Sequence, residues 1–102
     1  MANLDKLKWL AVDFDGTIAQ ANDDYTIGEP IIENINKLRE CVALDYKIII
    51  HTARHWEDYI LIEKWLNKHK VPYKQIICGK VLAHKYIDDR AIKADSDWVK
   101  EL

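Results

Sequence analysis

Two short apolar runs that end in polar residues constrain the fold of this 102-residue chain more than any other feature. Residues 8–13 read KWLAVD, and residues 45–52 read DYKIIIHT, with three consecutive isoleucines. A strand that is buried on both faces reads as a continuous apolar run, and such strands are typical of parallel sheets. The two runs therefore predict parallel strands in the core of an α/β protein.

Amphipathic helical patterns lie between and after these runs. Residues 28–44 include a proline suited to a first helical turn, and a second pattern covers roughly residues 55–70 until Pro72 ends it. The apolar residues of the first pattern recur at helical spacing: Ile31, Ile32, Ile35, Leu38 and Val42. Both segments are therefore expected to be helices with one buried face.

The remaining segments complete an alternating pattern. KQIIC (74–78) and HKYIDD (84–89) are two further strand candidates, and Ser96 or Asp97 is suited to cap a last helical turn. Strands that alternate with helices imply right-handed crossovers. We expect a single domain over residues 1–102, with an open, doubly wound, mostly parallel sheet between two helical layers.

Composition and charge limit the classes of partner. With 15 basic and 17 acidic residues the formal net charge is -2, so no overall positive field draws the chain to nucleic acid or anionic lipid. No apolar stretch resembles a signal peptide or a membrane span, and we expect a cytoplasmic protein without a membrane partner. Cys41 and Cys78 fit buried core residues better than a disulfide.

A pair of aspartates follows the first strand candidate, in the stretch LAVDFDGTIA. Asp13 and Asp15 are two residues apart, so on an extended segment they point to the same side. Crowded carboxylates repel each other unless a cation lies between them, and hard oxygen ligands suit Mg²⁺. The pair predicts a magnesium site, to which Asp88 and Asp89 add acids from another strand end. Since these two point to opposite faces if extended, Asp88 is favoured as the direct ligand.

Residues suited to an anion follow the same strand ends. Gly16 permits a turn that brings peptide N–H groups close to an anion, and Thr17 adds a hydroxyl. Thr52 offers a hydroxyl and an N–H after the second strand. Lys80 supplies positive charge. It is preferred to Lys85, because Lys85 lies within the expected strand 84–89 and is therefore a strand residue.

The order D-x-D-G-T, an apolar strand ending in threonine, a lysine and then D-D resembles the haloacid dehalogenase (HAD) superfamily of phosphohydrolases. The resemblance covers roughly residues 8–98. The stretches IIIHTAR and GKVLAHKYIDDRAI also resemble small phosphatase-like members from bacteria and phages. The resemblance to the HAD superfamily implies a Rossmann-like HAD core.

The resemblance also implies roles for individual residues. Asp13 would be the nucleophile that forms an aspartyl-phosphate, and Asp15 the general acid and base, which also ligates Mg²⁺ through its carbonyl. The metal site would take Asp13, Asp15, Asp88 and, as a further candidate, Asp89. The candidate phosphate-binding residues are Gly16, Thr17, Thr52, Ala53, Arg54 and Lys80.

Several side chains have two interpretations. Arg54 is suited either to bind a substrate phosphate or to form an ion pair at the start of a helix, and the sequence favours neither role. His51 and His55 bracket TAR, but no Cys or Glu completes a zinc set, so zinc is not favoured. A basic group near the second helix end is better explained as a solvated face that complements the helix dipole: Lys64, Lys68, His69, Lys70 and Lys74.

HAD proteins often carry an inserted cap domain, and the intervals in this chain leave no room for one. The loop 18–28 is then the segment able to act as a flap. An open site suits a bulky phosphorylated substrate, such as a macromolecular end, or a homo-oligomer whose neighbouring subunit closes the pocket.

The leading hypothesis is therefore a Mg²⁺-dependent phosphomonoester hydrolase that acts through an aspartyl-phosphate. One alternative is a phosphatase for nucleotides or polynucleotide ends. Another is a domain that binds a phosphorylated ligand or a partner without catalysis. Receiver domains of two-component signalling also carry acids, Thr and Lys, but they lack the contiguous D-x-D-G-T.

Overall fold

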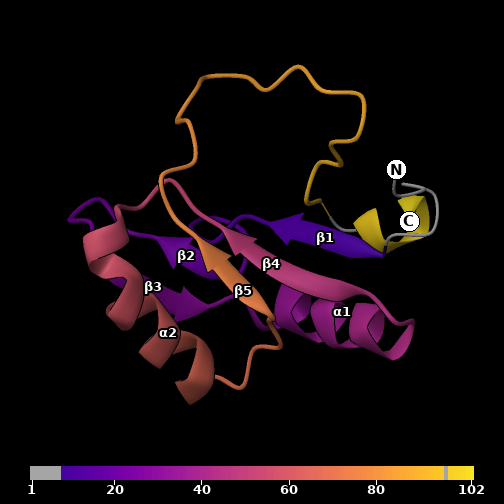
Figure 1. The fold of residues 1–102 in the computed structure, drawn as a ribbon, viewed down its shortest axis with the longest axis horizontal. Helices are drawn as coiled ribbons and strands as arrows, with labels where there is room; N and C mark the ends of the chain where they lie inside the picture. Colours follow the sequence, from indigo (N-terminus) through magenta and orange to yellow (C-terminus); the bar gives the residue numbers. More distant parts are fainter. Residues whose placement is uncertain (1–7, 96) are drawn as a thin grey trace, which may run out of the picture.

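A parallel three-stranded sheet forms the centre of the molecule (Figure 1). The structure is a computed structural model that describes residues 8–95 and 97–102. The strand order is β1 (Trp9–Val12), β4 (Lys47–His51), β5 (Gln75–Ile77). Each of these strands lies within an apolar run of the sequence, so the predicted parallel α/β arrangement is confirmed.

The helices connect the strands of this sheet. Helix α1 (Ile32–Ala43) links the N-terminal half to β4. A 3₁₀ turn, η2 (Trp56–Asp58), leads into α2 (Tyr59–Lys68), which precedes β5. The second helix thus matches its predicted span, whereas α1 begins later than residue 28.

The later start of α1 has a cause in the preceding segment, which forms a β-hairpin. Strands β2 (Ala19–Ala21) and β3 (Ile27–Pro30) pair antiparallel. In the turn, the carboxylate of Asp24 accepts hydrogen bonds from the N–H and the hydroxyl of Thr26. These hydrogen bonds lower the pKa of Asp24 and keep it charged. The expectation of a loop over 18–28 was therefore wrong, because local side-chain bonds and strand pairing order this segment.

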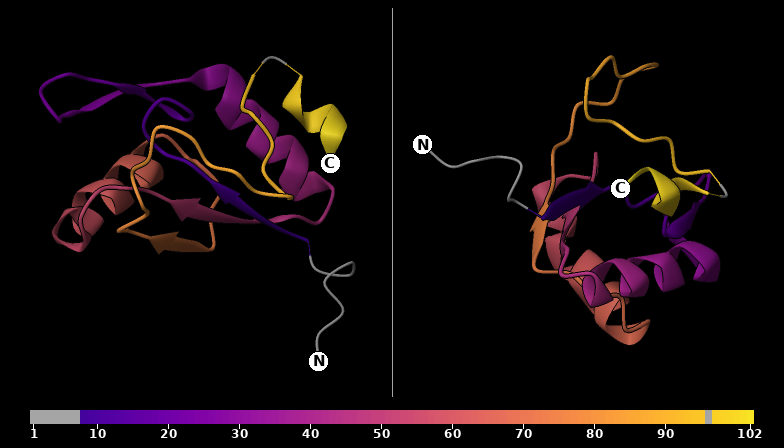
Figure 2. Two further views of the ribbon diagram at one scale, coloured as in Figure 1. Left: turned by 90° about the horizontal axis from the view of Figure 1, so that it is seen from above. Right: turned by 90° about the vertical axis from the view of Figure 1, so that its right-hand side faces the viewer.

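Both helices cover the same face of the sheet, which corrects the expected doubly wound, three-layer arrangement. The order β1–β4–β5 advances in one direction, and right-handed crossovers then place both connections on one side. In the right-hand view of Figure 2 the helices lie below the sheet and the segment 79–95 lies above it. Ile48 and Ile50 point toward the helices and are buried, while Ile49 between them is only partly covered.

The expected strand at 84–89 does not form. Residues 79–95 contain no strand or helix, and Figure 1 shows this segment arching away from the sheet. The Tyr86 hydroxyl bonds the backbone of Val81 and Ala83, and Asp88 accepts a hydrogen bond from the N–H of Arg90. Such local bonds compete with a strand ladder. HKYIDD also offers little apolar surface to bury, and Ile87 is exposed.

The core lies between the helices and the sheet. Its buried members come from both helices, several strands and the loops between them: Phe14, Ile18, Ala19, Ile35, Leu38, Cys41, Ile48, Ile50, Ile62, Leu66, Val71, Ile76, Cys78 and Trp98. Cys41 and Cys78 are free and buried, as expected, and burial raises the pKa of both thiols. None of the helices in the described residues is long and apolar enough to cross a membrane.

The C-terminal segment ends in a 3₁₀ turn, η3 (Trp98–Glu101). The buried Trp98 ring donates a hydrogen bond to Asn34 of α1 at 3.0 Å. Asp97 occupies the capping position but makes no side-chain capping bond, and Ser96 lies outside the described residues. Trp98, rather than a cap, therefore ties this turn to the domain.

We expect Gly28→Ala to destabilise the protein by about 1–3 kcal/mol in urea unfolding. A Cβ at Gly28 of β3 would collide with the backbone carbonyl of Gln20 on β2. Because the two strands pair directly, the backbone cannot yield without weakening the hairpin. Glu29→Ala, an exposed neighbour on the same strand, is the matched control and should change stability by less than about 0.5 kcal/mol. Equal stability of the two variants would contradict this hairpin register.

Candidate functional site

A pocket lies at the carboxyl ends of the parallel strands, where ligands bind in open α/β sheets. Its volume is about 230 Å³. Asp13 reaches it from the end of β1, Ala53 and Arg54 from the loop after β4, and Lys80 from the loop after β5. Five residues that the sequence assigned to the site therefore line one pocket: Asp13, Asp15, Ala53, Arg54 and Lys80.

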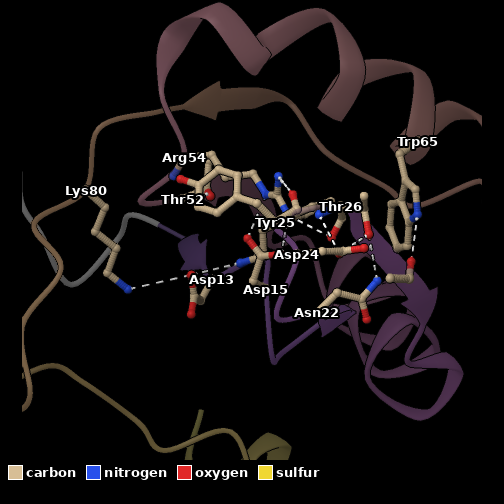
Figure 3. Close-up of polar contacts among 12 residues, drawn as sticks. Asp13, Asp15, Asn22, Asp24, Tyr25, Thr26, Thr52, Arg54, Trp65 and Lys80 are labelled. Carbon is tan, nitrogen blue, oxygen red and sulfur yellow. Dashed lines mark hydrogen bonds and ion pairs between the residues drawn. The ribbon is translucent and has the colours of Figure 1, made fainter.

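Asp13 and Lys80 face each other across this pocket (Figure 3). The Nζ of Lys80 lies 4.0 Å from the Oδ1 of Asp13, and the same Oδ1 accepts a hydrogen bond from the N–H of Phe14 at 2.9 Å. The Asp13 side chain is 43% exposed, so it is open to a ligand. Lys85 is exposed and does not line the pocket. The structure thus brings Lys80, the preferred lysine, to the acid.

The strongest polar contact of the site joins Arg54 to Asp15. The Nε and one terminal nitrogen of Arg54 donate to the two carboxylate oxygens of Asp15, both at 2.8 Å. Arg54 is buried, and the hydrogen bond to Asp15 raises the pKa of the guanidinium despite burial. Of the two interpretations of Arg54, the structure has the ion pair, but its partner is Asp15 rather than an acid at the helix start.

Arg54 also holds the tip of the hairpin. Its terminal nitrogens donate to the backbone carbonyls of Tyr25 at 2.8 Å and Thr26 at 3.3 Å. The Tyr25 ring lies over the guanidinium, with its centroid 4.9 Å away (Figure 3). Tyr25 has a φ of 68°, a conformation that a bulky residue adopts only when its surroundings impose it. One side chain thus fixes both Asp15 and the wall that the hairpin adds to the pocket.

The loop after β4 sets the position of Arg54. The hydroxyl of Thr52 accepts a hydrogen bond from the N–H of Arg54, and the carbonyl of Thr52 accepts one from the N–H of Lys80. The carbonyl of Arg54 in turn accepts one from Gly79. Thr52 is 1% exposed and does not line the pocket. In this structure it joins two loops, and the expected contact with a phosphoryl group is not open to it.

The turn that contains Gly16 and Thr17 does not form the expected anion cradle. The N–H of Gly16 donates to the carbonyl of Ala19, and the N–H of Thr17 donates to that of Phe14. Both N–H groups therefore bond within the turn, and neither Gly16 nor Thr17 lines the pocket. Gly16 has a φ of 82°, so its glycine serves the shape of this turn.

The structure does not bring Asp88 and Asp89 to the pocket. Both are exposed in the segment 79–95, because no strand carries them to the sheet edge. Among the described residues, no three His, Cys, Asp or Glu side chains come together in a way that could hold a metal ion. The expected rim of four carboxylates is therefore absent from residues 8–95 and 97–102.

Sequence reasoning missed the hairpin and loop residues of the pocket. These are Ala21, Asn22, Tyr25, Leu82 and Tyr86. The Asn-Asp-Asp-x-Thr order at 22–26 is a turn signal that points to the hairpin. Nothing in the sequence marks Leu82 or Tyr86 as pocket residues.

Comparison with solved structures supports the fold. A structural genomics target from Vibrio cholerae, solved as a crystal structure, matches with a TM-score of 0.74 and 38% identity, over 86% of this chain and 85% of that one. The chain belongs to the same family as this Vibrio cholerae protein. A conserved protein from Bacteroides thetaiotaomicron matches with a TM-score of 0.64 and 24% identity, over 94% of this chain and 87% of that one, which shows the fold alone.

No model of a known protein family and no curated protein matches the chain. The resemblance to the HAD superfamily and the functions that it implies stay predictions. A function for the chain therefore has to be inferred from the geometry of its pocket.

We expect Arg54→Lys to loosen the hairpin tip, because a lysine cannot bond both oxygens of Asp15 and two carbonyls at once. Amide hydrogen exchange at residues 25–27 should become at least about tenfold faster, which corresponds to about 1.4 kcal/mol of local opening energy. Arg90→Lys, at an exposed arginine outside the pocket, is the control and should leave exchange there unchanged. Identical exchange in both variants would show that Arg54 does not hold the tip.

Proposed function

We propose that the protein hydrolyses phosphomonoesters, with Asp13 as the nucleophile. The main support for the proposal is the position of two side chains in the pocket at the sheet edge. The exposed carboxylate of Asp13 and the ammonium group of Lys80 face each other there. A carboxylate is a competent nucleophile toward phosphorus, and a fixed positive charge stabilises the charge of a transferring phosphoryl group.

The proposed reaction has two displacements at phosphorus. An oxygen of Asp13 forms a bond to phosphorus while the bond to the leaving oxygen breaks, and that oxygen takes up a proton. Water then attacks the aspartyl-phosphate, loses a proton, and releases inorganic phosphate with the Asp13 carboxylate restored. Lys80 stays beside the phosphoryl oxygens through both displacements.

Asp15 is the proposed carrier of the proton, and Arg54 constrains it. Both carboxylate oxygens of Asp15 accept hydrogen bonds from Arg54, so Asp15 accepts a proton from water only when part of this pairing opens. Donation to the leaving group requires a protonated Asp15 that has given up part of this pairing. A phosphoryl group entering the pocket offers Arg54 a second anionic partner and so favours that release.

The four acids expected to hold Mg²⁺ are not assembled around the pocket. Asp88 and Asp89 do not line the pocket, and Arg54 occupies the carboxylate of Asp15 but not its carbonyl, so Asp13 is the open carboxylate left for an ion. Mg²⁺ requires octahedral oxygen coordination from one or two carboxylates together with water and phosphate. Magnesium dependence is proposed from the sequence resemblance, and the two displacements at phosphorus are described for the residues of the protein alone. Assays with and without added Mg²⁺ after EDTA treatment test it directly.

We expect Asp13→Asn to lower the hydrolysis of a generic phosphomonoester by at least about a thousandfold in kcat/KM, because the amide keeps the shape and removes the nucleophile. The matched control is Asp23→Asn in the hairpin turn, an exposed acid that does not line the pocket and should keep full activity. Both rates are measured as phosphate release by purified, folded protein. Turnover by Asp13→Asn equal to that of the control would exclude Asp13 as the nucleophile.

A second candidate function is the binding of a phosphorylated ligand without turnover. The pairing of Asp15 with Arg54 favours it, because a carboxylate held by both oxygens is poorly placed to donate a proton. Isothermal titration with inorganic phosphate and with beryllofluoride separates the two candidates. Binding that Lys80→Gln abolishes, in a protein that hydrolyses no substrate of a broad panel, would favour this function over hydrolysis.

A further inference from the structure

A second and larger hollow adjoins the pocket on the other side of Tyr25 and Arg54. It has a volume of about 510 Å³ and lies between the hairpin turn and α2. Tyr25 and Arg54 line both this hollow and the pocket that contains Asp13. We name it the hairpin groove, with Tyr25, Leu61 and Trp65 as its main apolar members.

We propose that the hairpin groove binds the nucleoside of a nucleoside monophosphate. The inference rests on the proposed function for one point, the position of the phosphate beside Asp13 and Lys80. A hollow of this size accommodates a small organic group, since ligand sites typically measure about 300–1,000 Å³. Because Tyr25 and Arg54 line both hollows, the groove lies directly beside the pocket in which the phosphate is placed, on the side of the hairpin tip.

The apolar members of the groove suit a planar ring. Tyr25 is 58% exposed although it is held by its stacking on Arg54, so it offers an oriented aromatic surface. Leu61 is 59% exposed on α2. Trp65 is fixed by a hydrogen bond to the carbonyl of Gly28 at 3.1 Å. Aromatic side chains held in this way stack on nucleobases without regard to base identity.

The charged members favour a single nucleoside over a nucleic acid strand. Asp24 and Asp58 bring two carboxylates to the groove, and Lys64 and Lys68 bring two ammonium groups. These four charges balance, and the fifth charged member of the groove, Arg54, is paired with Asp15, whereas strand binding depends on an excess of positive charge along the backbone. A neutral heterocycle with both N–H donors and acceptor atoms, attached to a ribose, can bond to both signs of charge.

Binding to the Asp13→Asn protein tests the inference without turnover. Isothermal titration calorimetry gives the affinity for each ligand, including one that does not reach the groove. We expect adenosine 5′-monophosphate to bind at least about tenfold more tightly than glycerol 3-phosphate, given the usual strength of base stacking on an aromatic side chain. An oligonucleotide with a 5′-phosphate should bind no more tightly than the mononucleotide at physiological salt.

Variants of the groove provide the control. Leu61→Gln and Tyr25→Ala should each reduce the preference for the nucleotide to within about threefold of equality, while Tyr25→Phe should retain it. Ile60→Gln is the matched control, because Ile60 is the neighbour of Leu61, is 56% exposed and does not line the groove. It should keep the full preference.

The outcomes separate this inference from the proposed function. Equal binding of the two phosphates, or a preference that Leu61→Gln leaves intact, overturns the groove as a nucleoside site. Tighter binding of the oligonucleotide overturns the choice of a single nucleoside. Phosphate release from adenosine 5′-monophosphate by the unmodified protein is measured separately. Its absence, with the nucleotide preference present, would remove hydrolysis and leave the groove as a nucleotide-binding site.

Discussion

The bidentate ion pair between Arg54 and Asp15 is the interaction on which the arrangement of the site depends. A buried guanidinium is costly unless its donors find partners. Here they reach four acceptors, the two oxygens of Asp15 and the carbonyls of Tyr25 and Thr26. Arg54 therefore joins the loop after β4 to the turn after β1 and to the hairpin tip, which lie 28–39 residues away in the sequence.

This pairing also links the two hollows of the proposed site. Arg54 and Tyr25 form the wall between the pocket of Asp13 and the hairpin groove. A change in the pairing of Arg54 would move Tyr25 and free Asp15 at the same time. In the proposed reaction, the phosphoryl group and the leaving group therefore both act on the side chain of Arg54.

Part of this arrangement could be predicted from the sequence. The runs that contain Ile48–Ile50 and Ile76 specify strands because their apolar content leaves no other stable place for them. Once they form a parallel sheet, Asp13 and Lys80 must lie at one edge, and the structure places them there. Asp15 and Ala53 also reach the pocket, as expected.

Other features depend on contacts that no local pattern contains. The pairing of Arg54 with Asp15 spans 39 residues, and sequence reasoning had no means to choose this acid. The hairpin turn is polar and is held by hydrogen bonds from Arg54 to the carbonyls of Tyr25 and Thr26 and by its own turn bonds. The motif suggested anion-binding roles for Gly16 and Thr52, whose polar groups the backbone uses instead. Asp88 stays away because the weakly apolar segment 84–89 adds no strand.

A double-mutant cycle tests the central claim, that Arg54 and Asp15 act as one unit, most directly. The free energies of unfolding in urea are compared for Arg54→Ala, Asp15→Ala, the double variant and the unmodified protein. We expect a coupling energy of about 1.5–3 kcal/mol, as for a well-formed hydrogen-bonded charged pair. A coupling below about 0.5 kcal/mol, as for an exposed surface pair, would contradict the account.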